Sequence, residues 1–138
     1  MQHTVSPVSA DTVVYDQVQQ HILDALSSGD ADAYVACFAA DAMLMPPGAE
    51  AVTGKDAIRA WVAGLFNQFD VTVQVFRQEL HFTSDWAFER HNYALTATPK
   101  NGGTPSVDRG KAVVISKRGP DGSWKGYIDC WNSNSSPA

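Results

Sequence analysis

The sequence lacks the features that would place it at a membrane or on nucleic acid. No apolar run approaches the roughly 20 residues that cross a bilayer, and the first dozen residues have neither the basic start nor the apolar block of a signal peptide. The net charge is −5 and no run of Lys and Arg occurs, which argues against nucleic acid and anionic membranes as partners. We therefore expect a cytoplasmic protein.

Cysteine and histidine are too few and too scattered to predict a metal centre. The two cysteines, Cys37 and Cys130, lie far apart among apolar neighbours. They could pair, but one bridge is an unusual framework, so we expect buried free thiols. The four histidines show no His-x-x-x-His spacing and no Cys-x-x-Cys motif occurs, so we expect no metal. A glycine-rich phosphate loop and a Gly-x-Ser-x-Gly motif are also missing, and we predict no cofactor.

Hydrophobic periodicity predicts helices in the first half of the chain. Apolar residues at helical spacing indicate an amphipathic helix over 13–28, which ends at Gly29. Asp30 can cap a second, short helix. Thr53 and Asp56 have the spacing of a capping box at the start of a third helix.

Strands dominate the second half. A short strand over 43–45 ends at the Pro46-Pro47-Gly48 corner. From Val71 the hydrophobic period changes to two, which predicts strands over 71–82, 86–98, 107–118 and 124–132, joined by hairpin turns. This order predicts an α+β fold in which a curved antiparallel sheet wraps around three helices. We expect one domain over 13–133, with a flexible N-terminal tail over 1–12 and a C-terminal tail over 134–138.

Several short motifs occur in an order that resembles a known family. They are Gly29-Asp30, Phe38-Ala39-Ala40-Asp41-Ala42, Pro46-Pro47-Gly48, Thr53-Gly54-Lys55, Ala57-Ile58, Gly110-Lys111 and Asp121-Gly122-Ser123-Trp124-Lys125. Together they resemble the nuclear transport factor 2-like superfamily, and within it the SnoaL-like, ketosteroid isomerase-like proteins of unassigned function. The resemblance implies a cone-shaped, cystatin-like α+β barrel with a blind pocket, and dimers formed through the outer face of the sheet. Fold alone does not give the function.

Comparison with ketosteroid isomerase argues against steroid-isomerase chemistry of that kind. Where that family keeps its general-base Asp, its oxyanion-hole Tyr and its protonated Asp, this chain has Pro46, Ile22 and Val113. The same comparison implies that Ile22 and the 111/113/115 face point into the cavity.

Strand alternation offers two faces for the strand from Trp86. One carries Arg90 and Asn92, and the other carries Glu89, His91 and Tyr93. A similarity of Ala87-Phe88-Glu89-Arg90 to the association domain of calcium/calmodulin-dependent kinase implies that Arg90 and Asn92 point inward. If the alternation is misplaced by one residue, Glu89, His91 and Tyr93 replace them, and a Glu89–His91 dyad becomes a candidate.

Asp129 is the predicted proton-transfer residue, since the SnoaL-like pattern places Tyr127, Asp129 and Trp131 inside. Cations in an apolar pocket need a partner, so we expect Arg90 to pair with Asp129 and Lys111 to lie nearby. That pair would bind a carboxylate or enolate, or else only close the base of the cone. The remaining predicted binding residues are Tyr15, Ile22, Met45, Trp61, Asn92, Val113, Tyr127 and Trp131, and Tyr15 could instead lie at an interface.

These observations leave three kinds of function open. The first is a cofactor-free isomerase, cyclase or hydratase that acts on an apolar carbonyl compound. The second is a non-catalytic dimeric module that binds a small apolar or carboxylate-bearing molecule. The third is an assembly domain without a ligand. In each case we expect a homodimer through the outer sheet face.

Overall fold

The computed structural model describes residues 4–5 and 10–135 of the 138. The elements along the chain are β1 (Thr4–Val5), α1 (Ala10–Ser28), α2 (Ala31–Ala36), β2 (Phe38–Met45), β3 (Val52–Thr53), α3 (Lys55–Gln68), β4 (Phe69–Phe82), β5 (Trp86–Pro99), β6 (Ser106–Arg118) and β7 (Trp124–Ser133). The three helices and four long strands match the order expected from periodicity.

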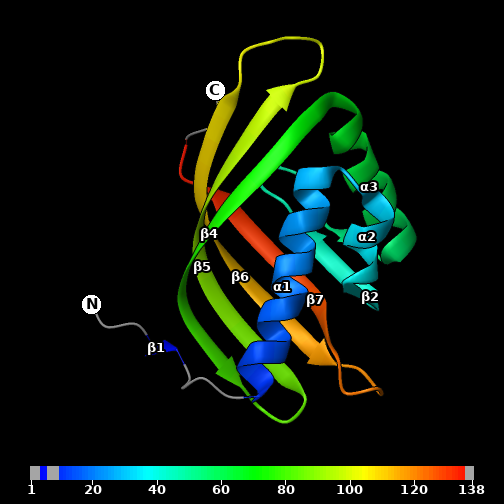
Figure 1. The fold of residues 1–138 in the computed structure, drawn as a ribbon, viewed down its shortest axis with the longest axis vertical. Coiled ribbons are helices and arrows are strands. Elements are labelled where there is room, and N and C mark those ends of the chain that lie inside the picture. Colours follow the sequence, from blue (N-terminus) through cyan, green and yellow to red (C-terminus); the bar gives the residue numbers. More distant parts are fainter. Residues whose placement is uncertain (1–3, 6–9, 136–138) are drawn as a thin grey trace.

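A seven-stranded sheet carries the fold, in the order β1-β4-β5-β6-β7-β2-β3. Strands β4 to β7 pair antiparallel, as predicted. The pairs β2–β7 and β1–β4 are parallel, so the sheet is mixed rather than wholly antiparallel. Figure 1 shows that the sheet is strongly curved and that α1, α2 and α3 all lie on its concave side. The α+β class and the wrapped arrangement are therefore confirmed.

Two apolar clusters fill the space between the helices and the sheet. The larger one joins α2 and α3 to β2, with Ile58, Val62 and Leu44 fully buried. The smaller one lies where the N-terminal half of α1 meets the sheet, and it contains Tyr15, Leu80 and Trp124. Helix α1 contributes to both clusters and lies along much of the concave face (Figure 1).

Local details differ from the sequence expectations at two places and agree at a third. Helix α1 begins at Ala10, inside the tail predicted over 1–12, whereas residues 1–3, 6–9 and 136–138 lie outside the described part. Asp30 caps α2 as predicted, since its carboxylate accepts from the Ala33 amide. The capping box is wrong, because Gly54 occupies the N-cap of α3 with φ of 90° and no side-chain hydrogen bond.

Both cysteines are free thiols, with Cys37 buried and Cys130 half-buried. Among the described residues, no helix has the length and apolarity needed to span a bilayer.

Candidate functional site

A pocket of about 110 Å³ lies between the helices and the inner face of the sheet. Its wall is mostly apolar and is formed by Leu26, Tyr34, Trp61, Leu65, Val71, Val73, His91, Tyr93, Leu95, Ala112, Asp129 and Trp131. None of these lining residues is Lys or Arg. Two groups in this wall, His91 and Asp129, are side chains of the kinds that serve as general acids and bases.

Asp129 on β7 is a half-buried carboxyl in the pocket wall. Within the described ranges, its side chain makes no hydrogen bond or ion pair within the usual distance limits. Burial raises the pKa of Asp129 to about 6, because desolvation penalises the carboxylate more than the nearby His91 stabilises it. The negative charge of Glu89 raises this pKa further, by a smaller amount. Asp129 can therefore give or accept a proton at neutral pH.

His91 and Glu89 on β5 form a buried dyad. The Nδ1 atom of His91 lies 2.5 Å from Oε2 of Glu89, and Glu89 is 1% exposed. Burial by itself would raise the pKa of Glu89, but the hydrogen bond with His91 and the charges of His91 and Arg77 outweigh it and leave the pKa below its ordinary value. An ionised Glu89 accepts the Nδ1 proton, so the basic nitrogen of a neutral His91 is Nε2.

Two tyrosines supply the other polar groups of the pocket. Burial, and then the charge of Asp129, raise the pKa of Tyr34 well above its ordinary value. The Tyr93 hydroxyl donates to Asp108 at 3.1 Å, and its ring lies against Gly110, where any side chain would collide with it. Both phenols stay protonated at neutral pH.

Three of the predicted site residues line the pocket, namely Asp129, Trp61 and Trp131. The two indole rings meet edge to face with centroids 5.8 Å apart. Three others lie elsewhere. Tyr15 is fully buried in the smaller cluster, Ile22 packs on the larger cluster, and Met45 is 40% exposed at the end of β2.

The predicted inward faces of β5 and β6 are wrong by one residue. Arg90 pairs with Glu79 at 2.6 Å instead of with Asp129. Asn92 is exposed, and Lys111 reaches Asn134 at 3.0 Å. Val113 is 37% exposed. The inward residues are Ala87, Glu89, His91 and Tyr93 on β5, and Gly110, Ala112, Val114 and Ser116 on β6.

Tyr127 is displaced from the face of Asp129 by a bulge. The β6–β7 register pairs Ile115 with Ile128 but Ser116 with Gly126, which leaves Tyr127 without a partner. The extra residue turns the Tyr127 ring to the outer face, where it packs against Trp86 with a centroid distance of 5.6 Å.

Sequence reasoning did not place several lining residues, among them Tyr34 and the helix residues Leu26 and Leu65. For His91 and Tyr93 the sequence did contain a pattern that indicates an inward position. Glu89 and His91 are a carboxylate and an imidazole two residues apart on a strand, so they share one face. That face also carries Ala87 and Tyr93, and it was the alternative left open above.

Comparisons with known proteins agree with this architecture. A family model described as the SnoaL-like domain matches residues 18–127. Its match ends before Asp129 and Trp131, so those residues rest on geometry alone. None of the curated proteins is similar enough to count as a match.

Three solved structures illustrate the likeness of fold. A ketosteroid isomerase-like protein from Erwinia carotovora atroseptica superposes with a TM-score of 0.79 at 24% identity, over 94% of this chain and 100% of that one. An NTF2-like superfamily protein from Salmonella enterica gives 0.80 at 12% identity, over 94% and 96%. A candidate scytalone dehydratase from Novosphingobium aromaticivorans gives 0.79 at 15% identity, over 91% and 85%. With the family match over most of its length, the chain belongs to the SnoaL-like domain family.

Proposed function

We propose that this protein is a cofactor-independent enzyme that moves a proton on a small, uncharged carbonyl compound, as an isomerase, cyclase or hydratase does. The observation that carries the proposal is that His91 and Asp129, from two different strands, both line one apolar pocket. An acid group and a base group in one apolar pocket are what enolisation needs. The names of two relatives, one isomerase-like and one a candidate dehydratase, describe chemistry of this type in those proteins.

The wall of the pocket favours an uncharged substrate. No Lys or Arg lines it, whereas Asp129 does, so an anionic ligand would be repelled rather than bound. Because Arg90 and Lys111 lie outside the pocket, the carboxylate-bearing ligand considered from sequence has no partner there. A cavity of about 110 Å³ is close to the roughly 150 Å³ of a cavity that holds benzene, which favours a single ring.

The proposed step uses only groups of this chain. The Nε2 atom of His91 takes the proton from the carbon next to the carbonyl. The electron pair of the broken C–H bond forms the C=C bond of an enolate, while the π pair of the carbonyl moves onto its oxygen. Glu89 stabilises the imidazolium that forms. Protonated Asp129 then returns a proton to the enolate, and the phenol of Tyr34 is a further donor for the developing oxyanion. Proton exchange with water removes the proton from the imidazolium and returns one to the Asp129 carboxylate, which restores both groups.

Deuterium exchange of cyclopentanone or cyclohexanone in D₂O, followed by NMR, tests this function without knowledge of the natural substrate. We expect the protein to accelerate exchange next to the carbonyl, and both His91→Gln and Asp129→Asn to reduce the acceleration about 100-fold, as loss of a general acid or base does. His21→Gln is a matched control, because His21 is exposed on α1 and lines neither the pocket nor the groove on the outer face of the sheet. Equal exchange by all three variants would contradict the proposal.

We also propose that two copies of the chain associate through the outer face of the sheet. Apolar side chains gather there, with Phe76 48%, Trp86 44% and Phe88 36% exposed, and a groove of about 410 Å³ runs beside Trp86 and Tyr127. Exposed apolar patches of this kind are typical of association surfaces. In sedimentation velocity the wild type should be a dimer and Trp86→Glu a monomer. Val13→Glu, on the exposed side of α1, should remain dimeric, and a monomeric wild type would refute the proposal.

A further inference from the structure

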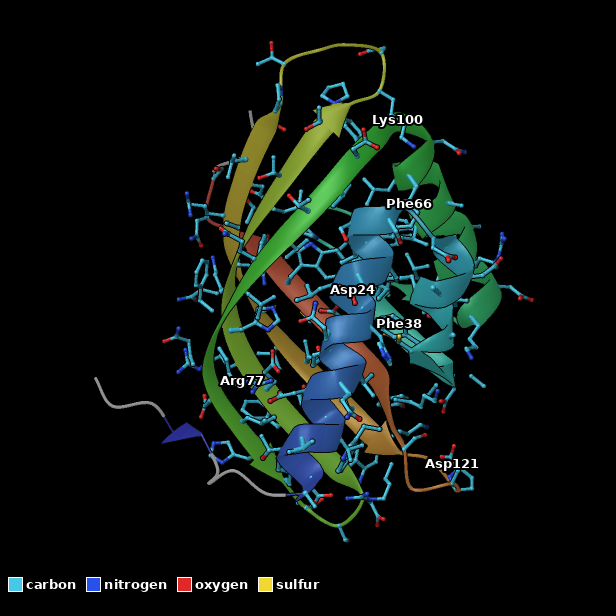
Figure 2. All side chains as sticks on the ribbon, viewed as in Figure 1. Asp24, Phe38, Phe66, Arg77, Lys100 and Asp121 are labelled. Atoms are coloured by element: carbon cyan, nitrogen blue, oxygen red, sulfur yellow. The ribbon has the colours of Figure 1, made fainter. Side chains whose placement is uncertain are left out.

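The His91–Glu89 dyad is the inner end of a longer chain of charged groups. Glu89 accepts from Arg77 through its other oxygen, Oε1, at 3.3 Å from Nε and 3.2 Å from Nη2. Nη2 of Arg77 also lies 2.7 Å from Asp16 Oδ1 on α1. Figure 2 shows Arg77 between β4 and α1. The four residues thus run from an exposed aspartate to the pocket wall.

Regular alternation along β4 places Arg77 on the inner face. Arg77 follows Val71, Val73 and Val75 at a spacing of two and pairs directly with His91. A bulge comes directly after it, because the register pairs Glu79 with Arg90 and leaves Gln78 without a partner. The bulge turns Glu79 to the outer face and so keeps this second carboxylate away from Glu89.

Arg77 is held by more than its two carboxylates. Its guanidinium lies 5.6 Å from the ring centroid of Tyr15, and it forms part of the wall of a groove between α1 and β4, together with Asp16 and Glu89. Its side chain is 24% exposed, against 1% for Glu89. Arg77 therefore covers the buried carboxylate on the side away from the pocket.

We propose that Arg77 is a positioning residue that fixes the tautomer of His91 through Glu89. The Arg77 guanidinium keeps Glu89 ionised and holds its Oε2 atom toward Nδ1 of His91, so that the proton of the neutral imidazole stays on Nδ1 and the lone pair of Nε2 serves the pocket. Without Arg77, a protonated Glu89 would donate to Nδ1, and the imidazole proton would move to Nε2. This inference rests on the proposed role of His91 as the base.

Two-bond ¹⁵N–¹H correlation spectra of the histidine rings test the inference, with His91→Gln assigning the signals. At a pH where the rings are neutral, the wild type should show the Nδ1–H form of His91. Arg77→Gln should lower the ratio of Nδ1–H to Nε2–H about fivefold, the effect of one lost hydrogen bond. Arg77→Lys, which keeps the charge, should restore most of the ratio.

The control is Arg59→Gln, which breaks an exposed ion pair with Asp32 and should leave the His91 signals unchanged. An Nε2–H form in the wild type, or an unchanged ratio in folded Arg77→Gln, would overturn the inference. If Arg77→Gln does not fold, Asp16→Asn removes only the outer anchor of Arg77, and a fall of about twofold is then expected, with no change again overturning the inference. If the protein does not accelerate ketone exchange but the tautomer of His91 still depends on Arg77, the proposed function is contradicted. The inference about Arg77 then stands.

Discussion

Glu89→Gln should lower the free energy of unfolding by about 3 kcal/mol, the usual cost of removing one partner from a buried ion pair. The carboxylate of Glu89 is 1% exposed and accepts from both Arg77 and His91. The amide of a glutamine has one oxygen and one NH₂ group, so its NH₂ group would face an N–H donor of either Arg77 or His91. The charge of Arg77 would also lose its buried partner. Urea denaturation followed by tryptophan fluorescence measures the change.

Asp32→Asn is the matched control for this prediction. Asp32 on α2 also pairs with an arginine, Arg59 on α3, at 2.6 Å, but both side chains are at least half exposed. We expect this variant to cost far less than Glu89→Gln, because solvent screens an exposed ion pair. Equal losses for the two variants would show that Glu89 is no more important to the fold than a surface carboxylate. The lowered pKa of Glu89 further predicts that its contribution disappears as the pH falls through that pKa.

Asp129→Asn should stabilise the protein at pH 8 by up to about 3 kcal/mol and have little effect at pH 4. The unfolded chain has the ordinary Asp pKa of 3.8, and the folded pKa is about 6. The folded state therefore holds the proton more tightly, and stability falls as the pH rises from about 4 to about 6. An asparagine, which is neutral at every pH, escapes this cost.

Urea midpoints at the two pH values measure the effect, with Asp70→Asn as the control because Asp70 is 75% exposed. A stabilisation of equal size at pH 4 and pH 8 would mean that the charge of Asp129 is not its origin. Asp129→Asn should thus gain stability and lose ketone exchange. This combination is typical of a functional residue, because the charge that the reaction needs lowers the free energy of unfolding.

Periodicity was sufficient for the fold because each long element repeats its pattern several times. The helices and the strands β4 to β7 agree with the prediction to within a few residues. The parallel pairing of β2 with β7 joins segments about 85 residues apart in sequence, and no local pattern reports such a contact.

The site was harder to predict because both faces of β5 carry large and charged residues. Trp86, Phe88 and Arg90 occupy the outer face, whereas Glu89, His91 and Tyr93 occupy the inner one. Hydrophobicity therefore does not show which face of β5 points inward. A shift of one residue in the alternation moves every side chain of the strand to the opposite face. The bulge at Tyr127 likewise cannot be recognised in the pattern of apolar and polar residues along β7. Asp129 was predicted correctly as a pocket residue, but its neighbour is His91 rather than Arg90.

The change of neighbour reverses the expected electrostatics of the site. Beside Arg90 and Lys111, Asp129 would be a stable carboxylate with a lowered pKa and a weak base. In an apolar wall without either cation, burial dominates and the pKa rises. The same aspartate thus changes from a structural partner to a group suited to proton transfer.

The most direct test of this account is the titration of Asp129 itself. In protein labelled with ¹³C at the aspartate side-chain carboxyl, the signal that disappears in Asp129→Asn should titrate with a midpoint near pH 6. A midpoint close to the ordinary 3.8 would show that Asp129 is solvated or paired, and it would contradict the claim that the pocket holds an acid–base group poised near neutrality.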